Sequence, residues 1–450
     1  MNSSDLAVVI LAAGKGTRMK SSLHKVLHPL ANRPMLLHLM DRLEALNPVK
    51  KIVVVGAGKD QVQATIGDQA EIVVQEPQLG TGHAVQMARE ALGDFQGNVL
   101  ILYGDVPMLT EDTLMAMVAA RTRTDGKAPA VVVLGFRPQD TKAYGRLVLN
   151  ESGELEAIIE HKDATTEQRQ ITLCNSGIMA VDGRMLFDLL EQISNTNASG
   201  EYYLTDIVAI ARQRGQSCAV VEAPEEEVMG INSRKELAEA EAIFQARMRD
   251  HFMAEGVTLL DPATVYFSHD TKIGQDVVIG PNVFFGPGVV VEDNVTIHSF
   301  SHLEGAVVRE GASVGPFARL RPKADVGRKA KIGNFVEVKK SVIEEGAKVS
   351  HLTYIGDAHV GAGANIGAGT ITCNYDGFNK FRTEIGKGAF IGSNTSLVAP
   401  VVIGEGAIIG AGSVVTRNVS GDALAVTRAE QKELGGWAAR FRSKQQKHKK

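Results

Sequence analysis

Residues 272–305 read KIGQDVVIGPNVFFGPGVVVEDNVTIHSFSHLEG, and an aliphatic or aromatic side chain returns at every sixth position from Ile273 to Leu303. With a few shorter steps and one interruption, the same rhythm continues to Val415. A six-residue period matches neither the 3.6-residue period of an α-helix nor the two-residue alternation of a strand. It is typical of a parallel β-helix, in which short strands and turns stack coil on coil.

The rhythm also predicts which side chains are neighbours on a wall of the β-helix. Three hexads make one coil, and the first position of each hexad points inward. Arg321 and Lys339 follow the inward residues Leu320 and Val338, at a position that is usually small, and they are one full coil apart. We therefore expect them on one face, separated by one strand spacing of about 4.8 Å. Either the two cations hold an anion, or they are solvated cations on a plain wall.

Further residues break the repeat on the C-terminal side of this pair. His351 occupies the third position of its hexad and should face outward, where a lone histidine is usually only a surface residue. The rhythm stops from Thr372 to Glu384, which predicts a loop, and loops on a rigid scaffold often carry function. Ser393 and Ala411 repeat the third position one coil apart and should form a groove of small side chains.

Composition excludes several classes of protein. The net charge of −4 gives no sign of a general nucleic-acid binder. The three cysteines are scattered, so a disulfide framework or a structural zinc site is not expected, and a reducing cytoplasm fits. No apolar run is long enough to span a membrane. We interpret the apolar start, Leu6 to Ala13, as a buried strand because it lacks the basic residues of a signal peptide.

The chain divides into regions of different pattern. Residues 1–232 alternate apolar runs with helical stretches, which predicts a parallel sheet buried on both faces. Ser233 and Glu236 form a capping box at the start of a helix that should link the two halves. The expected strands of the first half are 6–12, 51–55, 71–74, 98–103 and 130–136. From Arg440 to Lys450 the chain holds six Lys or Arg and no acid. We expect a solvated, disordered tail, with phosphate contact as the alternative.

The N-terminal stretch VVILAAGKGTRM, residues 8–19, is a strand that leads into a small-residue loop with cations. Backbone N–H groups of such a loop can approach phosphate oxygens. The spacing is neither that of a P-loop nor GxGxxG. Tyr103-Gly104-Asp105 ends a second apolar run, where open α/β sheets bind ligands. Asp105 is therefore a metal ligand or an exposed turn residue.

Several short motifs in the N-terminal half resemble those of known proteins. The string LAAGKGTRM (11–19), followed by Lys25, resembles the signature of sugar-nucleotide pyrophosphorylases. It is joined by further strings of the same type: QLGTGHA (78–84), YGDVP (103–107), EHKDAT (160–165) and EYYLTD (201–206). Together with the β-helix, these strings resemble the bacterial family of bifunctional N-acetylglucosamine-1-phosphate uridyltransferases and glucosamine-1-phosphate N-acetyltransferases over nearly the whole chain.

The resemblance implies an α/β plus β fold. Residues 1–232 would form a Rossmann-like nucleotidyltransferase (pyrophosphorylase) domain, 233–256 a linker helix, and 257–450 a left-handed parallel β-helix of hexapeptide repeats with a basic tail. It implies acetyl transfer from acetyl-CoA to glucosamine 1-phosphate, then uridylyl transfer from UTP, with release of pyrophosphate. The product, UDP-N-acetylglucosamine, would feed peptidoglycan and lipopolysaccharide precursors. The family further implies Mg²⁺, a cytoplasmic homotrimer, and no binding of nucleic acid or stable membrane association.

For the uridyltransferase half, the matched positions imply roles residue by residue. Arg18 and Lys25 would act on the phosphates, and Asp105 and Asn232 would hold Mg²⁺. The remaining nucleotide and sugar contacts would be Leu11, Ala12, Ala13, Gly14, Gln75, Gly80, Thr81, Tyr103, Gly104, Gly145, Glu160 and Asn175. Two positions depart from the family pattern, with His24 in place of Pro and Ser176 in place of Thr, and neither removes a functional group.

For the acetyltransferase half, His351 would be the catalytic base. Arg321 and Lys339 would hold the sugar phosphate, with Tyr354 and Asn365 completing the pocket. The acetyl-CoA contacts would be Ala368, Asn374, Tyr375, Ser393, Ala411 and Arg428. Lys323 stands where Gly is more usual, so the local turn should differ.

Two alternatives compete with this interpretation. One is a pyrophosphorylase of single activity whose β-helix is regulatory or serves oligomerisation. The cluster of Arg321, Lys339, His351 and Tyr354 argues against it, because a structural wall needs none of them. The other is a non-catalytic scaffold, against which Asp105 and the cationic first loop speak.

Overall fold

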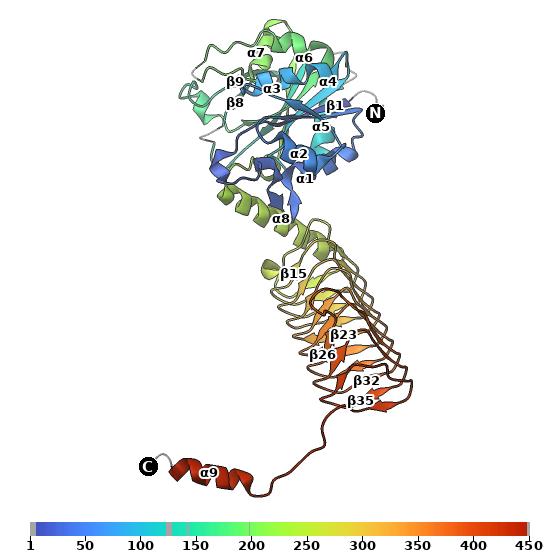
Figure 1. Ribbon diagram of the computed structural model, residues 1–450. Helices are drawn as coiled ribbons and strands as arrows, with labels where there is room; N and C mark the ends of the chain where they lie inside the picture. Colours follow the sequence, from blue (N-terminus) through green and yellow to red (C-terminus); the bar gives the residue numbers. More distant parts are fainter. Residues whose placement is uncertain (1–5, 123–127, 142–143, 198, 448–450) are drawn as a thin grey trace. The chain divides into compact units, whose positions relative to one another are not determined.

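The structure is a computed structural model that describes residues 6–122, 128–141, 144–197 and 199–447 (Figure 1). It divides into two compact units, Met1–Arg247 and Met248–Lys450. The helix α8 (Arg234–Ala254) contains the point of division.

The N-terminal unit is built from short helices and a large sheet. Its elements in chain order are β1 (Leu6–Ala12), η2 (Thr17–Met19), η3 (Lys25–Leu27), β2 (Pro29–Leu30), β3 (Arg33–Pro34), α1 (Met35–Glu44), β4 (Lys50–Val55), α2 (Lys59–Ile66), β5 (Glu71–Val74), α3 (Thr81–Met87), α4 (Arg89–Leu92), β6 (Asn98–Tyr103), α5 (Glu111–Arg121), β7 (Val131–Phe136), β8 (Arg146–Leu149), β9 (Leu155–Ile159), η4 (Gln168–Gln170), β10 (Cys174–Asp182), α6 (Gly183–Leu190), α7 (Asp206–Gln213), β11 (Cys218–Ala223) and η5 (Glu225–Glu227).

The large sheet has the strand order β11-β7-β10-β6-β1-β4-β5, with β8 and β9 attached at β10. All five strands expected from the sequence are present, as β1, β4, β5, β6 and β7. These five strands run parallel to one another, as predicted, whereas β10, which was not among them, runs antiparallel to its neighbours β6 and β7. Apolar cores cover both faces of the sheet. A strand buried on both faces reads as one apolar run in either direction, so the pattern does not reveal orientation.

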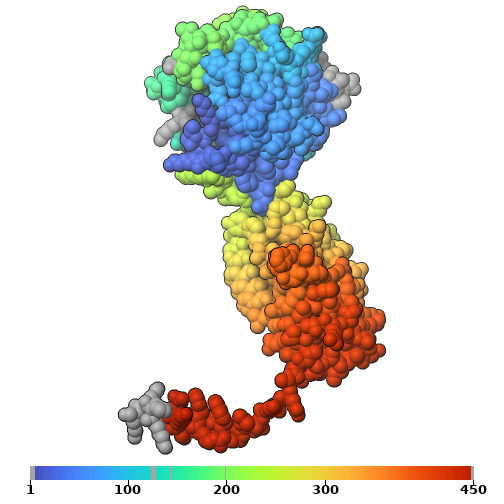
Figure 2. All heavy atoms as spheres, viewed as in Figure 1, coloured from blue at the N-terminus to red at the C-terminus, as the bar shows by residue number. Residues whose placement is uncertain are grey.

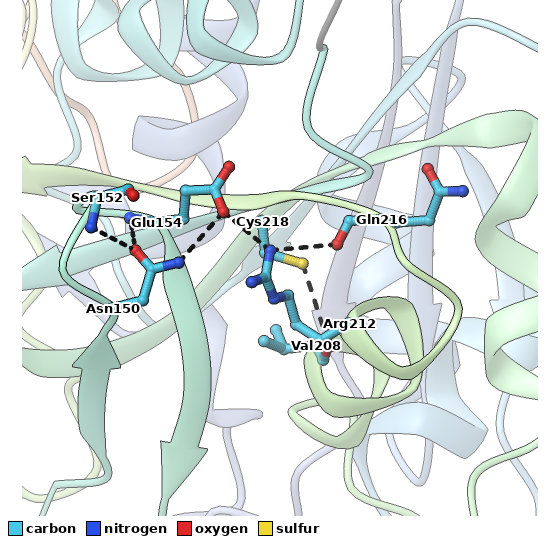
Figure 3. Close-up of polar contacts among 7 residues, drawn as sticks. All are labelled: Asn150, Ser152, Glu154, Val208, Arg212, Gln216 and Cys218. Atoms are coloured by element: carbon cyan, nitrogen blue, oxygen red, sulfur yellow. Dashed lines mark hydrogen bonds and ion pairs between the residues drawn. The ribbon is translucent and has the colours of Figure 1, made fainter.

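A polar cluster ties the hairpin of β8 and β9 to the neighbouring helix α7 (Figure 3). In the turn of the hairpin, Oδ1 of Asn150 accepts hydrogen bonds from the backbone N–H groups of Ser152 and Glu154, at 3.0 and 2.9 Å. Arg212 of α7 donates to the Glu154 carboxylate at 3.1 Å and to the Gln216 carbonyl at 3.4 Å. These contacts fix the turn of the hairpin against α7.

The start of α8 confirms the predicted capping box. The backbone N–H of Glu236 donates to Oγ of Ser233 at 3.3 Å, and the Glu236 carboxylate accepts from the backbone N–H of Asn232 at 2.8 Å. The backbone N–H of Ile231 donates to the carbonyl of Asp105 at 2.9 Å. The cap therefore holds Asn232 beside the end of β6, far from it in sequence.

The C-terminal unit is a three-sided parallel β-helix. Wall 1 contains β12 (Thr258–Leu259), β14 (Val278–Ile279), β17 (Thr296–Ile297), β20 (Ser313–Val314), β23 (Lys331–Asn334), β26 (Lys348–His351), β29 (Asn365–Ile366), β32 (Phe390–Ile391), β35 (Ile408–Ile409) and β37 (Leu424–Ala425). Wall 2 contains β13 (Lys272–Ile273), β16 (Val290–Val291), β19 (Ala306–Val308), β22 (Ala324–Val326), β25 (Val342–Ile343), β28 (Ala358–Val360), β31 (Thr383–Ile385) and β34 (Val401–Ile403). Wall 3 contains β15 (Phe284–Phe285), β18 (His302–Leu303), β21 (Arg319–Leu320), β24 (Glu337–Lys339), β27 (Tyr354–Gly356), β30 (Ile371–Cys373), β33 (Ser396–Val398) and β36 (Val414–Val415). The short helix η6 (Pro262–Thr264) precedes β13.

The predicted phase of the hexads is confirmed. The first positions fill one continuous core, and successive coils stack in parallel register, as in the pairing of Leu320 with Val338. The predicted loop is shorter than expected, because Thr372 is fully buried on β30. Its hydroxyl accepts a hydrogen bond from the backbone N–H of Gly356 at 2.8 Å, so the polar side chain is satisfied inside. Residues 374–382 form the loop proper.

The end of the chain differs from the prediction of a disordered tail, because Trp437–Lys447 form the helix α9. Residues 448–450 of the predicted tail lie outside the described residues. Cys174, Cys218 and Cys373 are all free. None of the helices in the described part of the chain has the length and apolar character needed to traverse a bilayer.

Truncation of one inward residue tests the predicted phase. Ile332 is fully buried and Ile408 is 48% exposed, and both lie on wall 1. We expect Ile332→Ala to lower the free energy of unfolding by about 2–5 kcal/mol and Ile408→Ala to change it by about 0.5 kcal/mol or less. Denaturant unfolding of the full chain measures both, and equal losses would contradict the assignment of inward and outward positions.

Candidate functional sites

The strands β1, β5 and β6 belong to the N-terminal unit, which is coloured blue to green in Figure 2. A cavity of about 870 Å³ opens at their carboxyl ends. This is the edge where open α/β sheets bind ligands. Ten of the expected nucleotide-site residues line it: Leu11, Ala12, Ala13, Gly14, Lys25, Gln75, Gly80, Thr81, Tyr103 and Asp105. Arg18 does not line the cavity and is exposed on η2, while Lys15, which the resemblance did not assign, does line it.

Lys25 connects two acceptors that are distant in the sequence. Its Nζ donates to Oδ2 of Asp105 at 2.6 Å and to Oδ1 of Asn232 at 2.9 Å. Both side chains of the ion pair are mostly buried, with 12% and 14% exposed. Gly16, with φ +60°, lets the first loop approach Lys25, because a Cβ there would lie 2.7 Å from Cβ of Lys25. The three polar groups therefore converge on one point, and two of them, Lys25 and Asp105, line the cavity.

The two oxygens fit a magnesium ion. A carboxylate oxygen and an amide oxygen are hard ligands of the kind that Mg²⁺ prefers, and Mg²⁺ in such sites keeps few protein ligands beside phosphates and water. Oδ2 of Asp105 and Oδ1 of Asn232 already face the same cationic group, the ammonium of Lys25. The pair therefore meets the chemical requirement for the expected metal ligands.

The opposite side of the cavity is organised by buried hydrogen bonds. The amide nitrogen of Gln75 donates to the Gly80 carbonyl at 2.9 Å and lies 3.1 Å from Nδ1 of His83. The Thr81 hydroxyl accepts from the backbone N–H of Leu204 at 3.0 Å. Burial, followed by the charge of Asp105, raises the pKa of the Tyr103 phenol, which therefore stays neutral. These residues present a fixed polar surface suited to a base edge.

The three residues expected to contact a sugar meet at the open end of the hairpin β8–β9. The backbone N–H of Asn175 donates to the Gly145 carbonyl at 2.9 Å. A Cβ at Gly145 would lie 3.3 Å from Oε1 of Glu160, so a larger residue there would push that carboxylate aside by a few tenths of an ångström. Burial, followed by the charges of Asp163 and Asp206, raises the pKa of Glu160.

On the β-helix, Arg321 and Lys339 lie on successive coils, as predicted. The sequence analysis missed Glu337, which accepts a hydrogen bond from Arg321 at 2.8 Å and so offsets one of the two charges. It also missed Lys380 of the loop. Lys380, followed by Arg321, lowers the pKa of the Lys339 ammonium, and Asp357 offsets this repulsion only in part. An excess of positive charge therefore remains where an anion would bind.

His351 faces outward, as predicted, and has a partner that sequence reasoning missed. Its Nδ1 lies 2.7 Å from Oδ1 of Asn334, the residue paired with it on the preceding coil. An amide oxygen only accepts, so Nδ1 is the donor in this hydrogen bond, and a neutral ring in this arrangement carries its lone pair on Nε2. This is the tautomer that a general base requires. Nothing in the sequence marks Asn334 except its position one coil before His351.

The remaining acetyl-site candidates fall at two different corners of the β-helix. His351, Ala368, Ser393 and Ala411 form one row at the corner between walls 1 and 3. The backbone carbonyls of His351, Ala368 and Ser393 accept hydrogen bonds from Gly369, Asn394 and Gly412 on the next coil, and Arg428 donates to the Ala411 carbonyl. Asn365 lies nearby on wall 1, and Tyr354 lies on wall 3 beside Glu337. Asn374 and Tyr375 belong to the loop between walls 3 and 2. Within one chain, the expected acetyl-CoA contacts are therefore not brought together.

Comparison with known proteins gives consistent matches over the whole chain. Residues 8–171 match the MobA-like NTP transferase domain, and residues 270–305 and 382–417 match the bacterial transferase hexapeptide (six repeats). Three curated relatives carry the name "Bifunctional protein GlmU". The protein of Rhizorhabdus wittichii is 62% identical over 98% of both chains, and that of Rhodospirillum rubrum is 60% identical over 97% of both. The protein of Paramagnetospirillum magneticum is 59% identical over 99% of this chain and 98% of its own.

The raised pKa of Glu160 makes a prediction about stability. Its ionised form costs free energy in the folded chain, so this cost is absent at low pH and appears as the pH rises. We expect Glu160→Gln to raise the free energy of unfolding at pH 7 by less than about 1 kcal/mol, because solvent screens this carboxyl. The gain should vanish at about pH 3, well below the ordinary pKa of a glutamate, where the carboxyl is protonated in both states.

Denaturant unfolding at the two pH values measures this difference. Glu156→Gln, at an exposed position on strand β9, which ends one residue before Glu160, is the control and should have no comparable effect. A loss of stability at pH 7 in Glu160→Gln would contradict the assignment.

Proposed function

The chain belongs to the family of bifunctional GlmU proteins, and from this premise we propose how its two sites divide the synthesis of UDP-N-acetylglucosamine. The fold is a Rossmann-like nucleotidyltransferase domain followed by a left-handed parallel β-helix of hexapeptide repeats. The enzyme acetylates glucosamine 1-phosphate and then transfers a uridylyl group to the product. The observation that carries the assignment is a cationic cluster in each of two compact units, around Lys25 in the first and around Arg321 and Lys339 in the second. We place the functional boundaries at residues 232 and 256.

In the N-terminal site, an oxygen of N-acetylglucosamine 1-phosphate attacks the α-phosphorus of UTP, and pyrophosphate leaves. Little covalent chemistry falls to the protein, which positions the groups and offsets charge. Lys25, which its hydrogen bond to Asp105 holds in place, would contact the phosphates, and Gln75 and Thr81, fixed by buried hydrogen bonds, would recognise uracil. Asp105 and Asn232 would hold Mg²⁺, which offsets phosphate charge when bound. Glu160 and Asn175 face the sugar.

In the C-terminal site, the amine of glucosamine 1-phosphate attacks the thioester carbon of acetyl-CoA. An amide bond forms, the C–S bond breaks, and the CoA thiolate leaves. Nε2 of His351 takes the proton from the amine, while Asn334 holds the ring in the required tautomer. The phosphate binds to Arg321, Lys339 and Lys380. Tyr354 and Asn365 complete the sugar pocket.

A homotrimer would complete this second site. Phe300, Phe317 and Phe335 are about half exposed and stack in a ladder at the corner that carries the His351 row, with ring centroids 4.9 and 5.1 Å apart. Leu352 extends the ladder beside His351 and is 63% exposed. Exposed apolar stripes of this kind mark interaction surfaces. A second copy on this ladder would bring its own loop residues Asn374 and Tyr375 toward the row. The free cysteines support a reducing, cytoplasmic location.

Separate inactivation of the two sites tests the proposal. We expect His351→Ala to lower acetyl transfer at least about 100-fold and to leave uridylyl transfer unchanged, because the base is lost from one site only. Asp105→Ala should have the opposite pattern. CoA release and pyrophosphate release measure the two half-reactions.

Two exposed positions provide matched controls, His298→Ala on the β-helix and Asp112→Ala on α5, and neither should affect either reaction. Loss of both half-reactions by one change, with the fold intact, would contradict two independent sites. Absence of CoA release from the unaltered chain would favour the single-activity pyrophosphorylase.

The aromatic ladder makes a prediction about assembly. Phe317→Glu places a charge at the centre of the stripe, and we expect it to convert trimers into smaller species and to lower acetyl transfer at least about tenfold, while uridylyl transfer persists. Light scattering of the purified protein measures the mass. Met115→Glu, exposed on α5, is the control. An unchanged mass would exclude the ladder as the interface.

A further inference from the structure

The loop 374–382 is a small hairpin with its own hydrogen bonds. The backbone N–H of Phe381 donates to the Asn374 carbonyl at 2.9 Å, and Tyr375 and Lys380 form a bridge between the two arms. The entering arm is tied to the β-helix through Asn374, whose amide donates to Oδ2 of Asp357 at 2.5 Å. The hairpin therefore moves as one piece, and its position depends on how its two ends are anchored.

The leaving arm is anchored by a chain of charges that spans three coils of wall 2. Arg382 at the end of the hairpin forms an ion pair with Glu384. The other oxygen of Glu384 lies 3.2 Å from Nδ1 of His359, on the preceding coil. Nε2 of His359 lies 2.9 Å from Oε1 of Glu344, one further coil back. The second oxygen of Glu344 accepts from the backbone N–H of Ala362 at 2.8 Å.

The position of His359 between two carboxylates sets a condition on its charge. Carboxylates only accept hydrogen bonds, and an imidazole ring donates from both nitrogens only when it is protonated. A neutral ring would point a lone pair at either Glu344 or Glu384. The hydrogen bond from His359, followed by that from Ala362, lowers the pKa of Glu344, so this carboxylate is ionised.

The backbone pairing of the strands alone places these groups beside one another. His359 is paired directly with Glu384 between β28 and β31, and with Val342 between β25 and β28. The titratable and charged groups that face the ring are therefore Glu344 and Glu384, with Arg382 behind Glu384. All are partly exposed, so the expected effect is a few-fold change and not the loss of the fold.

We propose that His359 is a positioning residue for acetyl transfer: its protonated ring clasps Glu344 and Glu384 and holds the leaving arm of the hairpin 374–382 in place. Neutralising the ring releases that arm and lowers the affinity of the site for substrate. Because Lys380 and Tyr375 travel with the hairpin, the KM values change more than kcat. The substrate-binding role of the hairpin rests on the proposed function, whereas the anchoring of the hairpin does not.

Three variants of the full chain test the proposal. His359→Gln removes the charge, and His359→Lys keeps a cation that stays protonated to high pH. Arg309→Gln is the matched control, because Arg309 bridges Glu292 and Asp325 on the same wall but far along it from the hairpin. KM and kcat for acetyl transfer are measured between about pH 5 and pH 8, the range in which imidazole side chains lose their charge. Hydrogen exchange of the hairpin amides is measured in parallel.

We expect His359→Gln to raise the KM for glucosamine 1-phosphate about three- to tenfold at pH 6, with kcat changed less than about twofold. As the pH rises, the KM of the unaltered chain should approach that of His359→Gln. At each pH, the KM of His359→Lys should be no higher than that of the unaltered chain. Hairpin amides should exchange at least about threefold faster in His359→Gln and at the original rate in Arg309→Gln.

Unchanged exchange in His359→Gln would overturn the anchoring role, whatever the hairpin binds. Faster exchange with an unchanged KM would overturn the link to substrate binding. Equal effects of His359→Lys and His359→Gln would show that the charge of the ring is not the cause. If the unaltered chain transfers no acetyl group, the proposed function fails, and the exchange data still decide the anchoring role.

Discussion

The parallel hydrogen-bond register between successive coils of the β-helix is the constraint on which the second site depends. Each coil closes after three hexads, one of which is sometimes shortened, as the pairs Asn334–His351 and Leu320–Val338 show. The inward aliphatic positions fix the phase, since a slip of one residue would turn core side chains to solvent. Because backbones on one wall lie about 4.8 Å apart, the register alone brings Arg321 beside Lys339 and Asn334 beside His351.

Both sites apply the same electrostatic rule to the binding of phosphate. Each pairs one cation with a carboxylate, Lys25 with Asp105 and Arg321 with Glu337. A cation paired in this way keeps a fixed position, since its hydrogen-bonding partner orients it. The excess positive charge then comes from a loop, as with Lys380, and this charge favours the anion. The rigid sheets supply the geometry, and the loops supply the adjustable part.

More of the fold than of the two sites could be predicted from the sequence. The six-residue period predicted that Leu320 and Val338 point into the core and that His351 faces outward, because the pattern of burial repeats in every coil of the β-helix. It did not reveal that β10 runs antiparallel, since an apolar run has no direction. Glu337 and Asn334 could not be recognised from the sequence, because an outward polar residue with a side-chain partner has the same sequence pattern as one that faces solvent. The meeting of Lys25 with Asn232 depends on the cap of α8 and could not be counted along the chain.

The central claim is that one chain carries two sites that work independently and in sequence. Mixing two single variants tests it most directly: one lacks His351 and the other lacks Asp105, and neither alone should make UDP-N-acetylglucosamine from glucosamine 1-phosphate, acetyl-CoA and UTP. The mixture should make it, because the acetylated sugar phosphate released by one protein is consumed by the other. A mixture that accumulates free CoA but forms no nucleotide sugar, or forms neither, would contradict the account.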